Sequence, residues 1–202
     1  REARGEYLLF LNNDVEIITE SWLEEMLQLC QQKDVGMAGA KLYYPDDTIQ
    51  HAGVVVGLGG VAAHVLCKLP RDAEGYMGRL RCVQEISAVT AACMMVKTSV
   101  FKAVGGFDEE LKVAFNDIDL CMKVRKYGVK IVFTPYAELY HYESKSRGME
   151  DTPEKQLRFS REVNCFRRKW ERELLKGDPY YNPNLTLNNT DCSLRKQEKN
   201  GD

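Results

Sequence analysis

The sequence has no apolar run long enough to cross a membrane. Its most apolar stretch, residues 52–67, is broken by four glycines and a histidine, whereas a transmembrane helix needs about 20 apolar residues. It also has no excess of one charge, since 28 Lys and Arg stand against 30 Asp and Glu for a net charge of -2. Domains that capture nucleic acid concentrate positive charge, so this balance argues against a nucleic acid partner.

Closely spaced cysteine pairs are absent as well. The seven cysteines include no Cys-x-x-Cys pair and their number is odd, which argues against both a zinc site and a disulfide framework. Most have apolar neighbours, so we predict free thiols in the core of a protein of the reducing cytoplasm. The chain begins at Arg1 without Met and enters a buried-type strand almost at once. We therefore expect it to be a piece of a larger protein.

The order of the predicted elements indicates an α/β fold. Apolar runs predict strands at 7–11, 35–42, 89–96 and 129–134, the last closed by Pro135, and apolar stripes predict helices at 21–32, 99–104, 117–127 and 154–175. Such alternation is typical of helices packed on a mostly parallel sheet. The run 7–11 is apolar on both faces, which predicts a central strand, and Ser21 followed by Glu24 predicts a capping box.

The domain boundary is predicted from composition. Residues 1–176 carry the periodic elements, and residues 177–202, which are rich in Pro, Asn, Asp and Tyr, form a C-terminal extension that we expect to finish in a polar, mobile end. The glycine-rich stretch 53–60 lacks the Gly-x-Gly-x-x-Gly order of a dinucleotide loop.

Polar side chains that could bind a ligand follow the first predicted strand. Open α/β sheets bind ligands beyond the carboxyl ends of their strands, and Asn12-Asn13-Asp14 stands at such an end. Asp14 offers a hard oxygen ligand for Mg²⁺ or Mn²⁺, while Asn12 offers a carbonyl oxygen or an amide hydrogen bond. The alternative is a turn that simply leaves the strand.

A second acidic cluster lies at a predicted helix start. Asp117 and Asp119 stand where the helix dipole favours carboxylates, so they serve either chemistry or helix capping. The glycine and distal glutamate of an EF-hand are missing.

A third cluster surrounds His141. It lies among polar residues, with Lys145 and Arg147 shortly after it, and both cations pair readily with phosphate. A metal or diphosphate contact and a histidine satisfied within the core remain the alternatives for His141.

In order along the chain, these clusters and the segments between them resemble the family 2 glycosyltransferases of bacterial surface-polysaccharide synthesis, including rhamnosyltransferase-like members. The run from Gly5 to Asp14 looks like the strand that leads into that family's Asp-x-Asp metal motif, with Asn12 in place of the first Asp. The similarity continues through the segments Ser87-Ala88-Val89-Thr90-Ala91-Ala92-Cys93, Val104-Gly105-Gly106-Phe107-Asp108-Glu109, Phe115-Asn116-Asp117-Ile118-Asp119-Leu120-Cys121, and His141 with 144–148.

The resemblance implies a GT-A fold that is truncated at its N-terminus, with residues 1–176 as its catalytic part. It implies a divalent metal, Mn²⁺ or Mg²⁺, held by Asp14 and His141, and an inverting transfer with Asp117 as the general base. The remaining implied positions are donor contacts at Asn12, Lys145 and Arg147 and an acceptor border at Gly106, Phe107 and Asp108.

The implied partners are a nucleotide diphosphate sugar and a saccharide or lipid-linked saccharide acceptor. The implied location is the cytoplasm, with a peripheral position at the inner face of the membrane as an option for a lipid-linked acceptor. Rhamnose, glucose, galactose and N-acetylhexosamine donors are all compatible with these motifs. Uncovered sheet edges would favour self-association. Two other functions stay open: a sugar nucleotidyltransferase, which would need a glycine-rich triphosphate loop with a lysine, and a non-catalytic interaction module.

Overall fold

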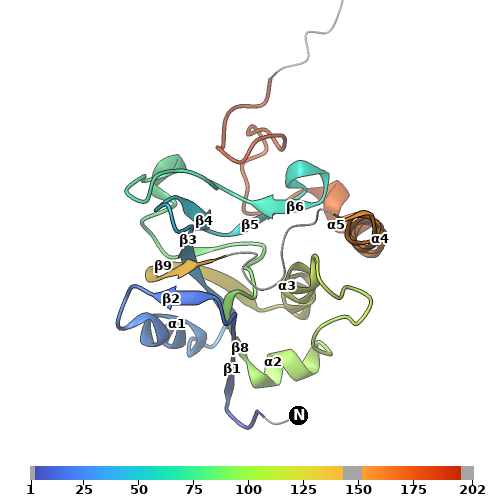
Figure 1. Cartoon of the computed structure of the whole chain (residues 1–202). Coiled ribbons are helices and arrows are strands. Elements are labelled where there is room, and N and C mark those ends of the chain that lie inside the picture. Colours follow the sequence, from blue (N-terminus) through green and yellow to red (C-terminus); the bar gives the residue numbers. More distant parts are fainter. Residues whose placement is uncertain (1–2, 143–151, 197–202) are drawn as a thin grey trace, which may run out of the picture.

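The computed structural model describes residues 3–142 and 152–196 of the chain. Its centre is a seven-stranded sheet with the main path β1-β8-β3-β9-β2, to which β4 is joined through β3 and β7 through β9 (Figure 1). The strands of this sheet are β1 (Tyr7–Leu11), β2 (Val15–Ile17), β3 (Val35–Tyr43), β4 (Ile49–His51), β7 (Gln84–Glu85), β8 (Cys93–Lys97) and β9 (Lys130–His141). A separate hairpin pairs β5 (Val54–Val56) with β6 (Ala62–His64).

Helices cover both faces of the sheet. One face carries α1 (Trp22–Cys30), and the other carries α2 (Thr98–Ala103) and α3 (Asn116–Tyr127). Beside α3 lie α4 (Pro153–Lys169) and α5 (Glu171–Lys176), and two short 3₁₀ turns, η1 (Leu58–Gly60) and η2 (Tyr76–Gly78), lie in the connection from β5 to β7 (Figure 1). Each face has its own buried cluster, with Met26 and Leu42 under α1 and Met37 and Phe133 under α3.

The sheet is not mostly parallel, contrary to expectation. Among the described strands only β3 and β9 pair in parallel, because β4 returns directly after a turn and β8 runs antiparallel between β1 and β3. The parallel pair still places the carboxyl ends of β3 and β9 side by side, with Tyr43 opposite Tyr140. The candidate site lies at this edge.

Pro135 does not end the last strand, which continues to His141. The pairing of β9 with β3 is irregular between Phe133 and Glu138, and a proline, which lacks an N–H, is tolerated where the ladder is interrupted. The strand therefore carries its polar end seven residues beyond the predicted limit of 134, into the site.

Two further expectations near the N-terminus are wrong, the central position of strand 7–11 and the capping box of Ser21. Among the described residues β1 lies at the edge of the sheet and pairs only with β8, so Leu9 and Leu11 are 37% and 41% exposed. Ser21 precedes α1 but its side chain makes no capping hydrogen bond. Its ψ of 19° differs from the extended backbone that a capping side chain requires.

The two later helices largely follow expectation. Helix α3 begins one residue before the predicted start and ends at Gly128, which has the left-handed φ of 96° typical of a helix stop. The predicted helix 154–175 is divided in two at Trp170, whose side chain is buried.

The described part of the C-terminal extension, residues 177–196, is packed on the rest of the domain. Tyr181, Leu185 and Cys192 are buried in the main cluster. The backbone N–H of Leu66 donates to the carbonyl oxygen of Thr190 at 2.6 Å. Widely spaced apolar residues in a polar sequence thus anchor this segment beside β5 and β6.

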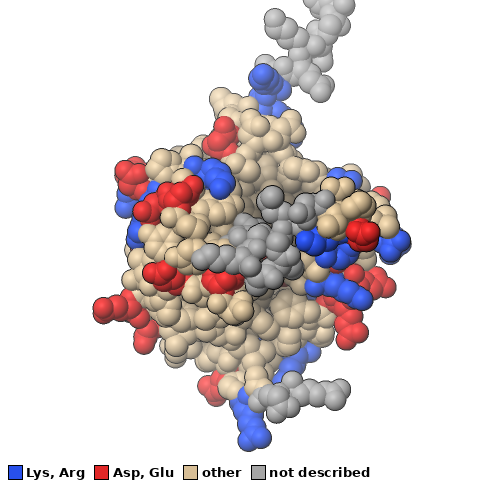
Figure 2. All heavy atoms as spheres, in the orientation of Figure 1, with Lys and Arg blue, Asp and Glu red and all other residues tan. Residues whose placement is uncertain are grey.

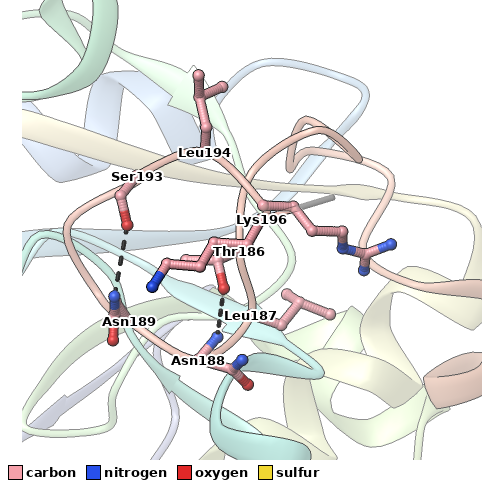
Figure 3. Close-up of a pocket in the computed structure, with 8 residues that line it drawn as sticks. Thr186, Leu187, Asn188, Asn189, Ser193, Leu194 and Lys196 are labelled. Carbon is pink, nitrogen blue, oxygen red and sulfur yellow. Dashed lines mark hydrogen bonds between the residues drawn. The ribbon is translucent and has the colours of Figure 1, made fainter. Parts of the chain in front are cut away.

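A hollow of about 850 Å³ lies inside this C-terminal segment (Figure 3). It is lined by residues 186–189 and 193–196 alone, with Asn188 N–H donating to the Thr186 hydroxyl oxygen at 3.2 Å. A single local segment therefore builds this hollow, apart from the strand ends that hold the candidate site.

Candidate active site

Three of the predicted side chains meet where β1 gives way to β2. Asn12 and Asp14 lie in the turn between these strands, and β2 pairs with β9 so that Val15 stands opposite His141. The Nδ2 atom of Asn12 lies 3.0 Å from Nε2 of His141, and Oδ1 of Asp14 lies 3.3 Å from the same nitrogen. The structure thus brings Asn12, Asp14 and His141 together from segments about 130 residues apart.

Gln50 of β4 holds the other side of the His141 ring. Its Oε1 lies 2.7 Å from Nδ1 of His141, and its Nε2 donates to the His141 carbonyl oxygen at 3.2 Å. Since an amide oxygen only accepts, Nδ1 carries the ring proton and donates it to Gln50. The lone pair of His141 is then on Nε2, facing Asn12 and Asp14.

This assignment favours a cation between Asp14 and His141. Oδ1 of Asp14 and Nε2 of His141 are both acceptors, and they face each other at 3.3 Å, an arrangement that a shared metal ion stabilises. Within residues 3–142 and 152–196, no group of three or more His, Cys, Asp and Glu side chains is arranged to hold a metal. Two protein ligands suit Mg²⁺ or Mn²⁺, which commonly complete their coordination with substrate phosphates and water.

Asp117 is connected to the same turn through two consecutive backbone residues. Its Oδ2 accepts the N–H of Ala91 at 3.1 Å, and the carbonyl oxygen of the next residue, Ala92, accepts the N–H of Asn12 at 3.0 Å. The segment is held against the sheet because β3 has Gly39 there: a Cβ at Gly39 would lie 2.3 Å from Val89. The carboxylate of Asp117 therefore lies near the turn that carries Asn12.

The start of α3 is held in a strained conformation. Phe115, which precedes the helix, has a left-handed φ of 62°, a state that costs a bulky residue about 1–3 kcal/mol. Its ring packs on Phe166 of α4 at 5.3 Å between centroids. Glu162 of α4, which is 3% exposed, accepts the backbone N–H groups of residues 112, 113 and 114 at 2.9–3.1 Å. Helix α4 thus fixes the loop that delivers Asp117.

Asp119, the other acid of this cluster, is fully buried and joins α3 to α4 and α5. Trp170 Nε1 donates to its Oδ1 at 2.8 Å, and Lys169 and Lys123 lie 2.8 and 3.2 Å from its two oxygens. Asp119 therefore ties the first turn of α3 to the junction of α4 and α5.

The predicted acceptor border packs beside this cluster. Gly106 has a left-handed φ of 66° and its carbonyl oxygen accepts from Lys123. Phe107 forms an edge-to-face contact with Phe10 at 5.0 Å between ring centroids, and Asp108 pairs with Lys169. The hydrogen bond from Lys169 lowers the pKa of Asp108. In the part of the chain that the structure describes, no hydrogen bond joins these three residues directly to Asn12, Asp14, Asp117 or His141.

Lys145 and Arg147 lie outside the described residues. Figure 2 shows Lys and Arg side chains beside Asp and Glu side chains at the right of the view, where α4 lies in Figure 1. The described cysteines are all free, and burial raises the pKa of the Cys30 and Cys93 thiols to about 12.

Across the described ranges, every helix is too short or too polar to span a membrane.

Sequence reasoning missed Gln50 and Glu162. Gln50 belongs to a strand of three residues next to the unassigned glycine-rich stretch, and no local pattern connects it with His141. Glu162 carried a usable signal. It is an acid four residues before Phe166 and three after Phe159, on the apolar stripe of its helix, and a charged residue at such a position is a candidate for a buried partner.

Comparison with known proteins places this geometry in a family. A model described as "Glycosyltransferase like family" matches residues 1–162. The Sinorhizobium fredii protein y4gI is 56% identical over 194 residues, which is 96% of this chain and 21% of the relative. The O-antigen biosynthesis protein RfbC of Myxococcus xanthus is 40% identical over 203 residues, covering 100% of this chain and 16% of the relative. This chain thus spans about a fifth or less of the length of these relatives.

A solved structure shows the same fold. The mannosyltransferase PcManGT from Pyrobaculum calidifontis, in complex with GDP-Man and Mn²⁺, matches with a TM-score of 0.52 at 15% identity, over 84% of this chain and 40% of that chain. The expected GT-A fold is confirmed.

Proposed function

This chain belongs to the glycosyltransferase-like family, and from this membership we propose that it forms the metal-binding and catalytic part of an inverting glycosyltransferase. A sugar would pass from a nucleotide diphosphate sugar to a hydroxyl group of a saccharide or lipid-linked saccharide. The similarity to RfbC supports a role in cell-surface polysaccharide synthesis. The GDP-Man and Mn²⁺ bound by PcManGT support the donor class and the divalent ion.

The observation that carries the proposal is the pair of facing acceptor atoms on Asp14 and His141, with Asn12 beside them. Asp14 and His141 would hold Mn²⁺ or Mg²⁺, which neutralises charge on the departing diphosphate. The Asn12 amide would donate a hydrogen bond to the donor. Lys145 and Arg147 would pair with its phosphates.

Asp117 would act as the general base. As the acceptor oxygen forms its bond to the anomeric carbon, the hydroxyl proton moves to the Asp117 carboxylate and the bond to the diphosphate oxygen breaks. The backbone N–H groups of Ala91 and Ile118, at 3.1 and 2.8 Å from its two oxygens, orient this carboxylate. Each oxygen keeps a lone pair for the incoming proton. Attack from the face opposite the leaving group inverts the anomeric centre.

The loop of Gly106, Phe107 and Asp108 would border the acceptor. Its contacts with Lys123, Phe10 and Lys169 fix it against the cluster that positions α3. We propose that the parent protein works in the cytoplasm, at the inner face of the membrane when its acceptor is lipid-linked. The exposed edge of β1 is the surface through which self-association would occur.

The test is a transfer assay with radiolabelled nucleotide sugars on the parent protein, with and without Mn²⁺, followed by assignment of the product anomer. Metal-dependent transfer with inversion supports the proposal. Release of pyrophosphate from a nucleoside triphosphate and a sugar phosphate would instead identify a sugar nucleotidyltransferase. Neither reaction, with an intact fold, would identify a non-catalytic interaction module.

A further inference from the structure

A hollow of about 610 Å³ lies over the carboxyl ends of β3 and β9, and neither Asp14 nor His141 lines it. Its floor is formed by Lys41 and Tyr43 of β3 and Glu138 of β9. Its rim is formed by the turn 46–48 and the loop 70–72. The volume is within the range of about 300–1,000 Å³ that is usual for small-molecule sites.

Lys41 lines this hollow, and its ammonium group lies over the Tyr43 ring at 5.2 Å from the ring centroid. It is 4% exposed, and its ammonium group donates to the carbonyl oxygen of Leu80 at 3.3 Å. An ammonium group has three N–H donors, and within the described residues no second acceptor lies within hydrogen-bond distance of this one. Burial lowers the pKa of Lys41. Because a buried donor without an acceptor destabilises the fold, an oxygen-bearing ligand would satisfy this group.

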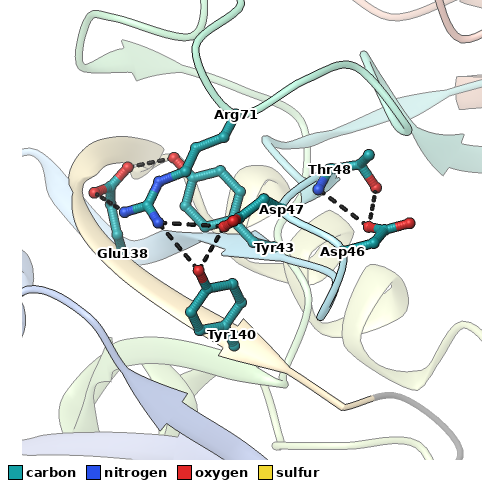
Figure 4. Close-up of polar contacts among 7 residues, drawn as sticks. All are labelled: Tyr43, Asp46, Asp47, Thr48, Arg71, Glu138 and Tyr140. Atoms are coloured by element: carbon teal, nitrogen blue, oxygen red, sulfur yellow. Dashed lines mark hydrogen bonds and ion pairs between the residues drawn. The ribbon is translucent and has the colours of Figure 1, made fainter.

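The opposite wall is organised by Arg71. One guanidinium nitrogen lies 3.3 Å from Oδ1 of Asp47 and 3.1 Å from the Tyr140 hydroxyl, and the other lies 3.4 Å from Oε2 of Glu138 (Figure 4). Glu138 also accepts from the Tyr43 hydroxyl. These contacts fix the carboxylates in place, yet each has about four acceptor positions and retains some for a ligand.

The charge of the lining selects the ligand class. The cations Lys41, Arg71 and Arg81 face four carboxylates, which are those of Asp46, Asp47, Asp72 and Glu138. With one negative charge in excess, the hollow disfavours phosphate and other anions. It offers both fixed donors and fixed acceptors, which suits hydroxyl groups because each hydroxyl donates once and accepts twice. We propose that this hollow is a subsite for a neutral saccharide unit.

The subsite adjoins the candidate active site through the chain itself. Tyr140, whose hydroxyl accepts a hydrogen bond from Arg71, is followed by His141. Thr48 lines the hollow two residues before Gln50, which holds His141. A saccharide unit in the hollow is therefore suited to be part of an acceptor chain whose end reaches Asp117. This last step rests on the proposed function, whereas the binding of the sugar does not.

The test is an NMR titration of the ¹⁵N-labelled 202-residue chain with methyl β-D-glucopyranoside, methyl α-L-rhamnopyranoside and methyl β-N-acetylglucosaminide. Inorganic phosphate and glucuronate serve as anionic probes. We expect saturable shifts at the amides of residues 41, 47, 48 and 138 with at least one neutral glycoside, and none there with phosphate. Shifts at those amides with the anions alone, or none with any neutral glycoside, overturn the proposal.

Variants distinguish this subsite from the metal site. Lys41→Met keeps the length of the side chain but removes its donors, and should weaken glycoside binding at least tenfold. If that variant does not fold, Arg81→Gln on the exposed rim provides the same comparison. Asp117→Asn should leave glycoside binding unchanged even where it abolishes transfer, so the two proposals fail separately. Unchanged affinity in the folded Lys41→Met or Arg81→Gln chain would contradict the subsite.

Discussion

His141 and Gln50 are joined twice. Nδ1 of His141 donates to the side-chain oxygen of Gln50 at 2.7 Å, and the side-chain nitrogen of Gln50 donates to the His141 carbonyl oxygen at 3.2 Å. Gln50 is 2% exposed, so water does not compete for these bonds. A single amide therefore fixes both the tautomer and the backbone position of the histidine. Outer-shell partners of this kind typically change metal affinity by about 10–100-fold when they are removed.

Gln50→Leu should therefore weaken Mn²⁺ binding by the 202-residue chain about 10–100-fold, measured by electron paramagnetic resonance titration. The ¹⁵N shifts of the His141 ring should change from one tautomer to a mixture, which reports the loss directly without metal. Gln28→Leu, at an exposed position of α1, is the matched control. Equal Mn²⁺ affinity in the Gln50→Leu and Gln28→Leu chains would contradict a positioning role.

Asp117→Asn should lower the transfer rate of the parent protein by about 10²–10⁴-fold, because the amide cannot take the acceptor proton. Donor affinity, measured by calorimetry, should stay unchanged. Asp34→Asn is the control, since Asp34 lies at a distant surface and pairs with Lys130. A transfer rate near that of the native protein in the Asp117→Asn variant would exclude the base assignment.

Glu162→Gln should lower the free energy of unfolding by about 1.5–3 kcal/mol. The buried carboxylate accepts three backbone N–H groups of residues 112–114, and an amide nitrogen in its place would face one of these donors. Urea denaturation checks the change. Glu154→Gln, at the exposed first turn of α4, should have little effect. Similar stabilities of the two variants would contradict the anchoring of the loop before α3 by α4.

Stability should fall as the pH decreases below about 6.5, in part through His51. This side chain is fully buried, and burial holds its pKa well below the usual 6.5, with the nearby His64 and His141 acting in the same direction. Below pH 6.5 the unfolded chain binds a proton at His51 that the folded chain does not. The free energy of unfolding is therefore highest above pH 6.5 and decreases as the pH falls below it. The slope from one group reaches about 1.4 kcal/mol per pH unit at most.

His51→Gln should reduce the slope of the free energy of unfolding against pH between about pH 5 and 6.5. Urea denaturation at several pH values in this range measures the slope. His64→Gln, whose parent side chain is half-buried and hydrogen-bonded to the Gln50 carbonyl oxygen, is the comparison. An unchanged slope in the His51→Gln chain would show that this histidine is not held neutral by the fold.

Local sequence patterns predict those helices and strands whose limits depend on neighbouring residues in the chain. The helix ending at Gly128 follows from its apolar stripe and from a glycine stop, and its acids lie at the helix start as expected. The strand 7–11 was identified, but its position in the sheet was not, because edge and centre depend on which other strands are present. Likewise the sequence predicts that Pro135 ends the last strand. The strand tolerates this proline because the pairing of β9 with β3 is irregular there, which the local sequence does not reveal.

The candidate site was predicted in part for the same reason. Asn12, Asp14 and His141 stand beside strand ends, and such ends can be located from apolar runs. The partner Gln50 could not be found in this way. It contacts His141 across 91 residues of sequence, and a three-residue strand has no periodicity of its own.

The central claim is that Asp14 and His141 hold one divalent cation near the carboxylate of Asp117. The most direct measurement is paramagnetic line broadening in the ¹⁵N-labelled 202-residue chain on addition of Mn²⁺. We predict that broadening is strongest at the amides of residues 12, 91, 117 and 142, and that Asp14→Asn abolishes it. Broadening centred instead on residues 46 and 47, or unaffected by Asp14→Asn, would contradict the account.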